Sequence, residues 1–177
     1  MVGRDSRSLS RAVASGEAVK MRRGVFVGGG GWASVNDRDR YLLRMRAVAA
    51  TRSSTPIFSH YSAAVIWGLP IIGQWPHEVH LLAGRRGGLH SKNGVAIHHD
   101  RLDDADIVEV DGMLVTSLAR TLIDLARSTS FLSAVASLDA GTRPKLQLLN
   151  GTQRPGVERE LLLDRMLSLG AGRGHWN

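Results

Sequence analysis

Residues 108–127 have the sequence VEVDGMLVTSLARTLIDLAR, in which two short strand-like runs lead directly into a helical pattern. The runs 107–110 and 113–116 flank Asp111-Gly112, a pair typical of a tight hairpin turn. From Ser117, which can cap a helix, apolar residues recur at helical spacing. The stretch therefore predicts a β-hairpin followed by an amphipathic helix.

Similar patterns occur on both sides of this stretch. Further strands are expected at 78–83 and 94–99, and further helices at 36–51, 59–67, 132–140 and 157–169. Asn36 is expected to cap the helix at 36–51, whose apolar stripe is formed by Tyr41, Leu42, Met45 and Val48 or Ala49. Runs of short strands with separate helices are typical of an α+β fold. We expect a small antiparallel sheet packed with helices.

The N-terminal segment combines a basic helix with a basic hairpin. A helical pattern at 5–15 carries arginine every three or four residues, so these cations share one face. Two strand-like runs, 18–21 and 24–27, follow around a basic turn. This order is that of the second half of a winged helix-turn-helix, in which a recognition helix precedes a wing. We expect DNA contacts from Arg4, Ser6, Arg7, Ser8, Arg11, Lys20, Arg22 and Arg23.

The excess positive charge is confined to the same end of the chain. Residues 1–52 contain eleven Lys and Arg against four Asp and Glu, whereas residues 53–177 contain twelve of each. A solubilising surface has no need to be so one-sided, and one-sided charge is typical of a module that touches a polyanion. Double-stranded DNA is therefore the expected partner, ahead of an anionic membrane surface.

Glycine fills positions 28–31, which favours a flexible linker between two modules. A phosphate-binding loop is rejected here because no Lys-Ser or Lys-Thr pair follows. The expected division is a winged-helix remnant at 1–30 and an α+β domain at 36–177.

The composition excludes several classes of site. The chain has no cysteine, so it has no disulfide, thiolate zinc site or cysteine nucleophile. No signal peptide is visible, and the longest apolar stretch, 63–72, is too short to cross a bilayer. We expect a cytoplasmic protein.

Five segments carry a family resemblance: EAVKMRRGVFV (17–27), FSHYSAAVIWGLP (58–70), VHLLAG (79–84), GVAIHHDRL (94–102) and VEVDGMLVTSLARTLIDLAR (108–127). In this order they resemble signature segments of the AbiEi family of type IV antitoxins, of the actinobacterial type. The resemblance implies a winged helix that binds operator DNA and represses its own operon. It also implies a C-terminal antitoxin domain that antagonises a nucleotidyltransferase-like toxin in an abortive infection (phage defence) system, in many cases without stable contact.

Two departures from the family pattern leave alternatives open. The chain begins almost at the recognition helix, which implies a truncated start or a reduced module that needs a homodimer partner. It ends at Asn177 without the carboxylate cluster of the endonuclease-like domain found in many relatives. The alternatives to an antitoxin and transcriptional autorepressor are an interaction-only antitoxin domain and a truncated relic of an endonuclease-like fusion protein.

Four histidines on or next to two strand-like runs are chemically able to bind zinc, namely His77, His80, His98 and His99. Because His98 and His99 are consecutive on a strand, their side chains should point to opposite faces. We expect structural or surface roles for them, and no metal or other cofactor.

Other polar groups have similarly ordinary explanations. His60 and Ser62 could serve as base and nucleophile, but no third group orients them at this spacing, so packing and capping are expected. Arg120 and Asp124 are expected to form an ion pair that ties helix to sheet. No catalytic residue is predicted, and we expect the chain not to be an enzyme.

The last two features are an acidic run and a pair of tryptophans. Asp100, Asp103, Asp104 and Asp106 lack the Gly and Glu of a calcium loop, so a solvated turn is expected. Trp67 and Trp75 are expected to be core and turn residues, and not a platform on which bases stack.

Overall fold

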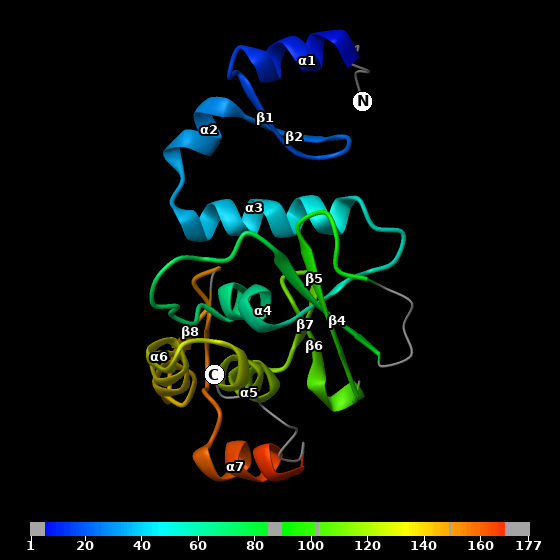
Figure 1. The fold of residues 1–177 in the computed structure, drawn as a ribbon. Coiled ribbons are helices and arrows are strands. Elements are labelled where there is room, and N and C mark those ends of the chain that lie inside the picture. The colour runs from blue at the N-terminus through cyan, green and yellow to red at the C-terminus, as the bar shows by residue number, and fades with distance from the viewer. Residues whose placement is uncertain (1–5, 85–89, 102, 149, 169–177) are drawn as a thin grey trace. The chain divides into compact units, whose positions relative to one another are not determined.

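The computed structural model describes residues 6–84, 90–101, 103–148 and 150–168, and within these ranges it is a mixture of helices and small sheets (Figure 1). This confirms the α+β class. The chain divides into two compact units, one that ends at Ser54 and one that begins at Thr55. The predicted division at residues 28–36 differs from this one, because residues 36–54 group with the N-terminal unit.

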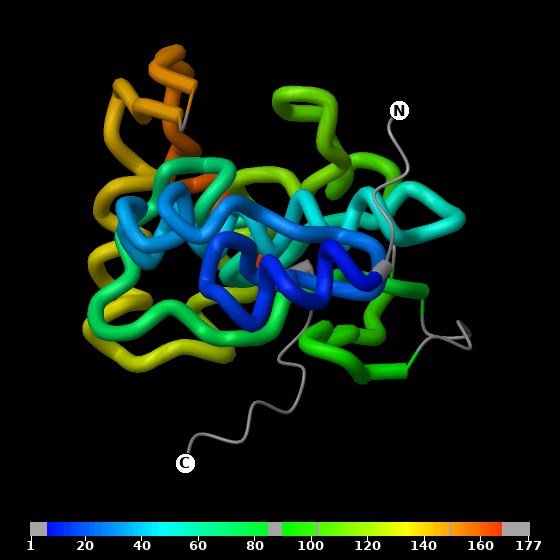
Figure 2. The backbone as a smooth tube through the Cα atoms, turned by 90° about the horizontal axis from the view of Figure 1, so that it is seen from above, coloured from blue at the N-terminus to red at the C-terminus, as the bar shows by residue number. Residues whose placement is uncertain are grey.

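The N-terminal unit begins with the predicted helix and hairpin. Helix α1 (Ser6–Ala14) is followed by strands β1 (Ala18–Arg22) and β2 (Val25–Gly28), which pair antiparallel. Helix α1 packs against β1, and the two can be followed side by side in Figures 1 and 2. All three elements lie within two residues of their predicted bounds.

The predicted glycine linker is wrong: helix α2 (Gly29–Ser34) begins there. Gly29 donates to the carbonyl of Glu17, and a Cβ on Gly29 would lie 1.8 Å from the carbonyl oxygen of Gly16. Only glycine allows this close approach, so the residue serves packing and not flexibility. At the other end of α2, Arg40 donates from Nε to the carbonyl of Trp32 and lies over its ring.

Helix α3 (Asp37–Ala50) completes the N-terminal unit and begins at the predicted cap, since Asn36 Oδ1 accepts from the backbone of Asp39 at 2.9 Å. Its apolar residues recur every three or four positions, and Tyr41, Met45 and Val48 are buried. This is the stripe that the sequence predicted.

The C-terminal unit is built on a five-stranded sheet in the order β5-β4-β3-β7-β6. The strands are β3 (Ile57–Phe58), β4 (Val79–Gly84), β5 (Val95–Asp100), β6 (Ile107–Val110) and β7 (Met113–Thr116). The sheet is mixed, so the prediction of an antiparallel sheet is correct only in part: β3 pairs with β4 and β6 with β7 antiparallel, whereas β3 pairs with β7 and β4 with β5 parallel. Side chains alternate with the same period in both kinds of pairing, so the pattern did not reveal strand direction.

The β6–β7 hairpin has the predicted turn. Asp111 and Gly112 have φ values of 51° and 71°. Two successive residues in the left-handed region form the turn that suits a two-residue hairpin, and Asp-Gly pairs favour it.

Four helices accompany this sheet: α4 (His60–Trp67), α5 (Leu118–Ser128), α6 (Phe131–Gly141) and α7 (Arg159–Ser168). Helix α4 packs on β4 and β7 (Figure 1). Helix α5 contacts each of the other three helices, α4, α6 and α7. A short 3₁₀ helix η1 (Asp104–Asp106) and a small hairpin of β8 (Leu146–Gln147) and β9 (Gln153–Arg154) complete the unit.

The core of this unit lies between α4, α5 and the sheet. Trp67 is 5% exposed, and its indole donates to the carbonyl of Thr116 at 2.9 Å, so its predicted core role is confirmed. Thr116 and Thr121 bond to each other through their hydroxyls, which fixes the start of α5 against the end of β7. These buried polar groups are paired, as stability requires.

Candidate functional site

The predicted DNA-contacting residues lie on three consecutive elements of the N-terminal unit. On α1, Arg7, Ser8 and Arg11 are exposed, and Arg7 and Arg11 are one helical turn apart. Ser6 is the first residue of this helix. Arg4 lies outside the described residues. The described cations of α1 therefore share one exposed face.

The basic residues of the hairpin lie on β1 and at its turn. Lys20 is exposed and pairs with Phe26 across the strands, Arg22 is half-buried at the end of β1, and Arg23 is exposed in the turn itself. Burial and then the nearby charge of Arg22 lower the pKa of the Arg52 guanidinium. Arg52 thus adds a further cation close to the hairpin, which the sequence analysis did not single out.

A second charged site lies in the C-terminal unit, around Arg120 of α5. This side chain is 1% exposed and contacts three carboxylates: its Nε lies 2.9 Å from Asp124, one terminal nitrogen 2.7 Å from Asp100, and the other 3.6 Å from Asp106. Burial alone would lower the pKa of Arg120, but Asp124, Asp100 and Asp106 outweigh it and raise the pKa. The predicted Arg120–Asp124 ion pair is confirmed within α5, and the contacts of Arg120 with Asp100 and Asp106 join this helix to β5 and η1.

The predicted solvated acidic turn is wrong for Asp106. Its side chain is 3% exposed and also accepts from Arg165 of α7 at 2.7 Å. Asp103 does behave as a turn residue, since it caps η1 by accepting from the backbone of Ala105. Arg165 comes 59 residues after Asp106 in the chain, so no local pattern could have indicated this pair.

Three histidines from three different elements converge next to this network. The parallel register places Leu82 beside His98, so His80 and His98 share one face of β4 and β5. His80 Nδ1 and His98 Nε2 are 2.9 Å apart, and the His98 ring stacks on that of His60 with centroids 3.6 Å apart. The sequence pattern grouped His80 with His98 only in a possible zinc site, for which structural or surface roles were expected instead, and it did not connect His60 with either.

These histidines are held neutral. Burial, with smaller contributions from the neighbouring rings, lowers the pKa of His60 well below its usual value and that of His80 to about 4. Burial likewise lowers the pKa of His98. A cluster of neutral rings can hydrogen-bond and stack without charge repulsion. Within the described ranges, no three His, Asp or Glu side chains are arranged to hold a metal ion.

His60 is not part of a nucleophile relay. Its Nδ1 lies 3.1 Å from Ser59 Oγ and 3.9 Å from Asp124 Oδ2, so the serine hydroxyl and the carboxylate both lie next to the same ring nitrogen. A serine triad requires them on opposite nitrogens. Ser62, the other serine considered, accepts from the backbone of His80 through its hydroxyl, which is a packing role as expected.

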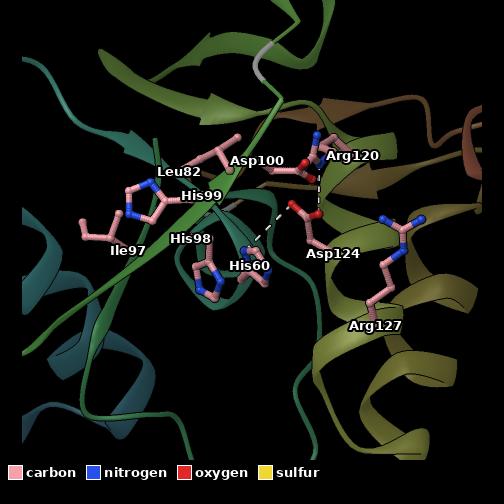
Figure 3. A pocket seen from close by; sticks show the side chains of 9 residues that line it. All are labelled: His60, Leu82, Ile97, His98, His99, Asp100, Arg120, Asp124 and Arg127. Atoms are coloured by element: carbon pink, nitrogen blue, oxygen red, sulfur yellow. Dashed lines mark hydrogen bonds and ion pairs between the residues drawn. The ribbon is translucent and has the colours of Figure 1, made fainter. Parts of the chain in front are cut away.

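Asp124 is the most unusual group of this site. Its side chain is 5% exposed, and within the described part of the chain its Oδ2 accepts no hydrogen bond. Burial raises the pKa of this carboxyl to about 6, although Arg120 opposes the shift. A pocket of about 350 Å³ opens here, and Figure 3 shows Asp124 and His60 facing each other in it.

Comparison with known proteins adds no family assignment. No protein-family model matches the chain, and no curated protein matches it. None of the helices in the described ranges is long and apolar enough to span a membrane.

Proposed function

We propose that this protein is a DNA-binding regulator in which α1 is the recognition helix and the β1–β2 hairpin is the wing. The observation that carries the proposal is the succession of exposed cations on these elements, Arg7 and Arg11 on the helix and Lys20 and Arg23 on the hairpin. In a winged helix the helix enters the major groove, where arginine can fork onto guanine, while wing cations neutralise phosphates.

The salt dependence of binding provides the quantitative test. About six phosphate contacts would give a slope of log K against log salt near −5. We would titrate the full chain against its own upstream promoter DNA and a scrambled duplex by fluorescence anisotropy, at two or more salt concentrations. Tighter, salt-sensitive binding to the promoter is expected.

A matched pair of variants separates specific contacts from total charge. The test variant carries Arg7→Ala, Arg11→Ala, Arg22→Ala and Arg23→Ala, and the control carries Lys92→Ala, Lys145→Ala, Arg154→Ala and Arg159→Ala. The control residues are exposed and lie in the C-terminal unit. The test variant should lose its preference for the promoter, and the magnitude of its slope of log K against log salt should fall by about three to four. The control variant should keep the promoter preference and the slope of the wild type. The proposal would be contradicted if both variants lost promoter preference and slope equally, or if binding by the wild type did not depend on salt concentration.

The second part of the proposal is that the regulator is an antitoxin and autorepressor of the AbiEi type, acting against a nucleotidyltransferase-like toxin. Its support is the sequence resemblance, four segments of which fall on the elements from β3 to α5. Co-expression with a nucleotidyltransferase-like toxin encoded beside it should restore growth. The quadruple Arg variant should still restore growth while failing to repress, because the antitoxin activity is assigned to the C-terminal unit.

Failure of one part has a distinct meaning. Growth rescue without any DNA binding would indicate the interaction-only antitoxin domain. DNA binding without rescue would leave a regulator with another role, and absence of both results would contradict the whole proposal.

A further inference from the structure

The basic side chain of Arg52, at the end of α3, is not used to cap that helix. Thr51 Oγ1 donates to the carbonyls of Ala47 and Val48 at 2.9 and 3.2 Å, and the backbone amides of Thr51 and Arg52 also donate to the last turn. A cation near a helix C-terminus often donates to these carbonyls. Within the described part of the chain the Arg52 guanidinium donates to none of them, so capping does not account for it.

The two ends of the Arg52 guanidinium have different surroundings. Nε is buried and has no hydrogen-bond partner, whereas the terminal nitrogens are not enclosed. Among the described residues, none forms a hydrogen bond or an ion pair with this side chain. The buried stem therefore holds the side chain against the N-terminal unit, while the terminal edge is open to solvent with unused donors. An anion would bind this terminal edge, and not the enclosed Nε.

Arg22 brings a second cation close to Arg52 from a different element. It is the last residue of β1, and α3 packs against this strand. Figure 1 shows the turn of the hairpin and the C-terminal end of α3 at the same end of the N-terminal unit. After burial, the charge of Arg22 is the second cause that lowers the pKa of Arg52, and no carboxylate opposes it. The two cations are therefore held near each other, and no described carboxylate compensates Arg52.

The surroundings of Arg52 differ from those of the buried Arg120. Three carboxylates contact Arg120 and raise its pKa. Near Arg52 a like charge takes their place, and like charges held together are unfavourable for the folded protein by itself. Binding sites commonly keep such uncompensated groups, because the ligand compensates them. Guanidinium groups bind phosphate oxygens through parallel N–H···O bonds, so a phosphate group is the ligand that suits this pair.

We propose that Arg22 and Arg52 together bind one phosphate group of the DNA backbone. This inference rests on the proposed DNA-binding function, and it extends the contact from the wing to the end of α3. A backbone contact positions the duplex but carries no sequence information, so this site should act equally on promoter and unrelated DNA. The preference for one sequence remains with the side chains of α1, which would reach the base edges.

The salt dependence of DNA binding tests the contribution of Arg52. In the anisotropy titration of the full chain, Arg52→Gln should weaken binding to promoter and scrambled DNA by the same factor. The magnitude of the slope of log K against log salt should fall by about one, as expected for the loss of one phosphate contact. Arg46→Gln is the matched control, because Arg46 is an exposed arginine of the same helix and its removal changes the net charge equally. An unchanged slope in Arg52→Gln, or an equal loss in Arg46→Gln, would overturn the proposal.

Uncharged DNA analogues test whether the two arginines share one phosphate. Each phosphate of the promoter duplex is replaced in turn by a methylphosphonate, and binding of the wild type and of the variants is measured. One replacement that weakens the wild type should have a much smaller effect on both Arg22→Gln and Arg52→Gln, and its full effect on Arg46→Gln. If the two variants lost sensitivity at different phosphates, the arginines would not form one site and the proposal would be overturned.

Stability measurements separate a binding role of Arg52 from a structural one. Removing one of two repelling cations should leave the urea midpoint of Arg52→Gln equal to that of the wild type or higher, while DNA binding weakens. A lower midpoint would indicate a structural role and overturn the proposal. Arg52→Lys keeps the charge and should keep the salt slope. Salt-sensitive binding by the wild type with an unchanged Arg52→Gln overturns this inference alone, whereas absence of salt-sensitive binding by the wild type contradicts the proposed function as well.

Discussion

The arginines of α1 and of the β1–β2 turn contrast with Arg120 of the C-terminal unit. From Arg7 to Arg40 no residue is buried, and the cations of α1 and the hairpin turn lie on the surface. In the C-terminal unit Arg120 is 1% exposed and is surrounded by carboxylates. The comparison teaches that the same residue type lies exposed on the first unit, where we propose that it binds DNA, and forms a buried structural cross-link in the second. It can be tested by removing cations from each.

The largest effect is expected from Arg120→Met. Removing this side chain leaves Asp100, Asp106 and Asp124 without their shared cation in a largely buried site. Breaking a buried ion pair on one side typically lowers the free energy of unfolding by about 3–5 kcal/mol. Urea unfolding followed by circular dichroism measures it, with Arg154→Ala as the control. A loss below about 1 kcal/mol would show that the network is not a structural cross-link.

Acid should destabilise the C-terminal unit through its histidines. A histidine whose pKa is lowered in the folded state contributes stability at high pH, and this stability is lost as the pH falls from 6.5 through the folded pKa. For His80, with a folded pKa of about 4, the loss by pH 4 is at most about 3 kcal/mol.

His60 and His98 act in the same direction, and Asp124 acts against them. Its raised pKa of about 6 means that it takes up a proton more readily when folded, which adds stability as the pH falls below 6. Three histidines outweigh one carboxyl, so the free energy of unfolding should decrease from pH 7 to pH 4. His80→Gln should flatten this dependence and His77→Gln should not. A pH profile unchanged in His80→Gln would contradict the assignment.

A smaller effect is expected in the N-terminal unit from Gly29→Ala. The added methyl group would overlap the carbonyl of Gly16, so α2 and the turn between α1 and β1 would have to move apart, which would cost about 1–3 kcal/mol. Gly31→Ala meets no atom within 4 Å and should be neutral or stabilising by up to about 1 kcal/mol. Hydrogen exchange of the β1 and β2 amides reports on this unit specifically. Equal exchange rates in both variants would contradict the packing role of Gly29.

The smallest effect on stability is expected from Arg7→Ala and Arg23→Ala. Both residues are exposed, and surface substitutions usually change the free energy of unfolding by no more than about 0.5 kcal/mol. The same two variants should weaken DNA binding in the anisotropy titration. If they instead destabilise the fold as Arg120→Met does, the contrast between the two units fails.

Local signals predicted most of the elements. Asn36 and Ser117 both cap helices as expected, the latter by accepting from the backbone of Arg120 at 3.3 Å. The Asp111-Gly112 turn and the bounds of β6 and β7 were also correct. In each case the deciding interaction lies within a few residues of the signal, so the sequence pattern contains it.

Features that depend on distant partners were not predicted. The direction of β5 relative to β4, the meeting of His60 with His98, and the pairing of Asp106 with Arg165 all join segments far apart in the chain. Position 29 was predicted as part of a flexible linker because the sequence alone does not show whether a glycine serves a flexible turn or a close approach between two segments. The DNA contacts themselves stay a prediction.

The Arg120 network also bears on the order in which the C-terminal unit folds. Arg120 and its three carboxylates all lie between residues 100 and 124, so few residues must be ordered to bring them together. Arg165 reaches Asp106 across 59 residues. We expect β5, η1 and α5 to assemble early and α7 to dock last, so that the buried arginine acquires its carboxylate partners before α7 packs against them.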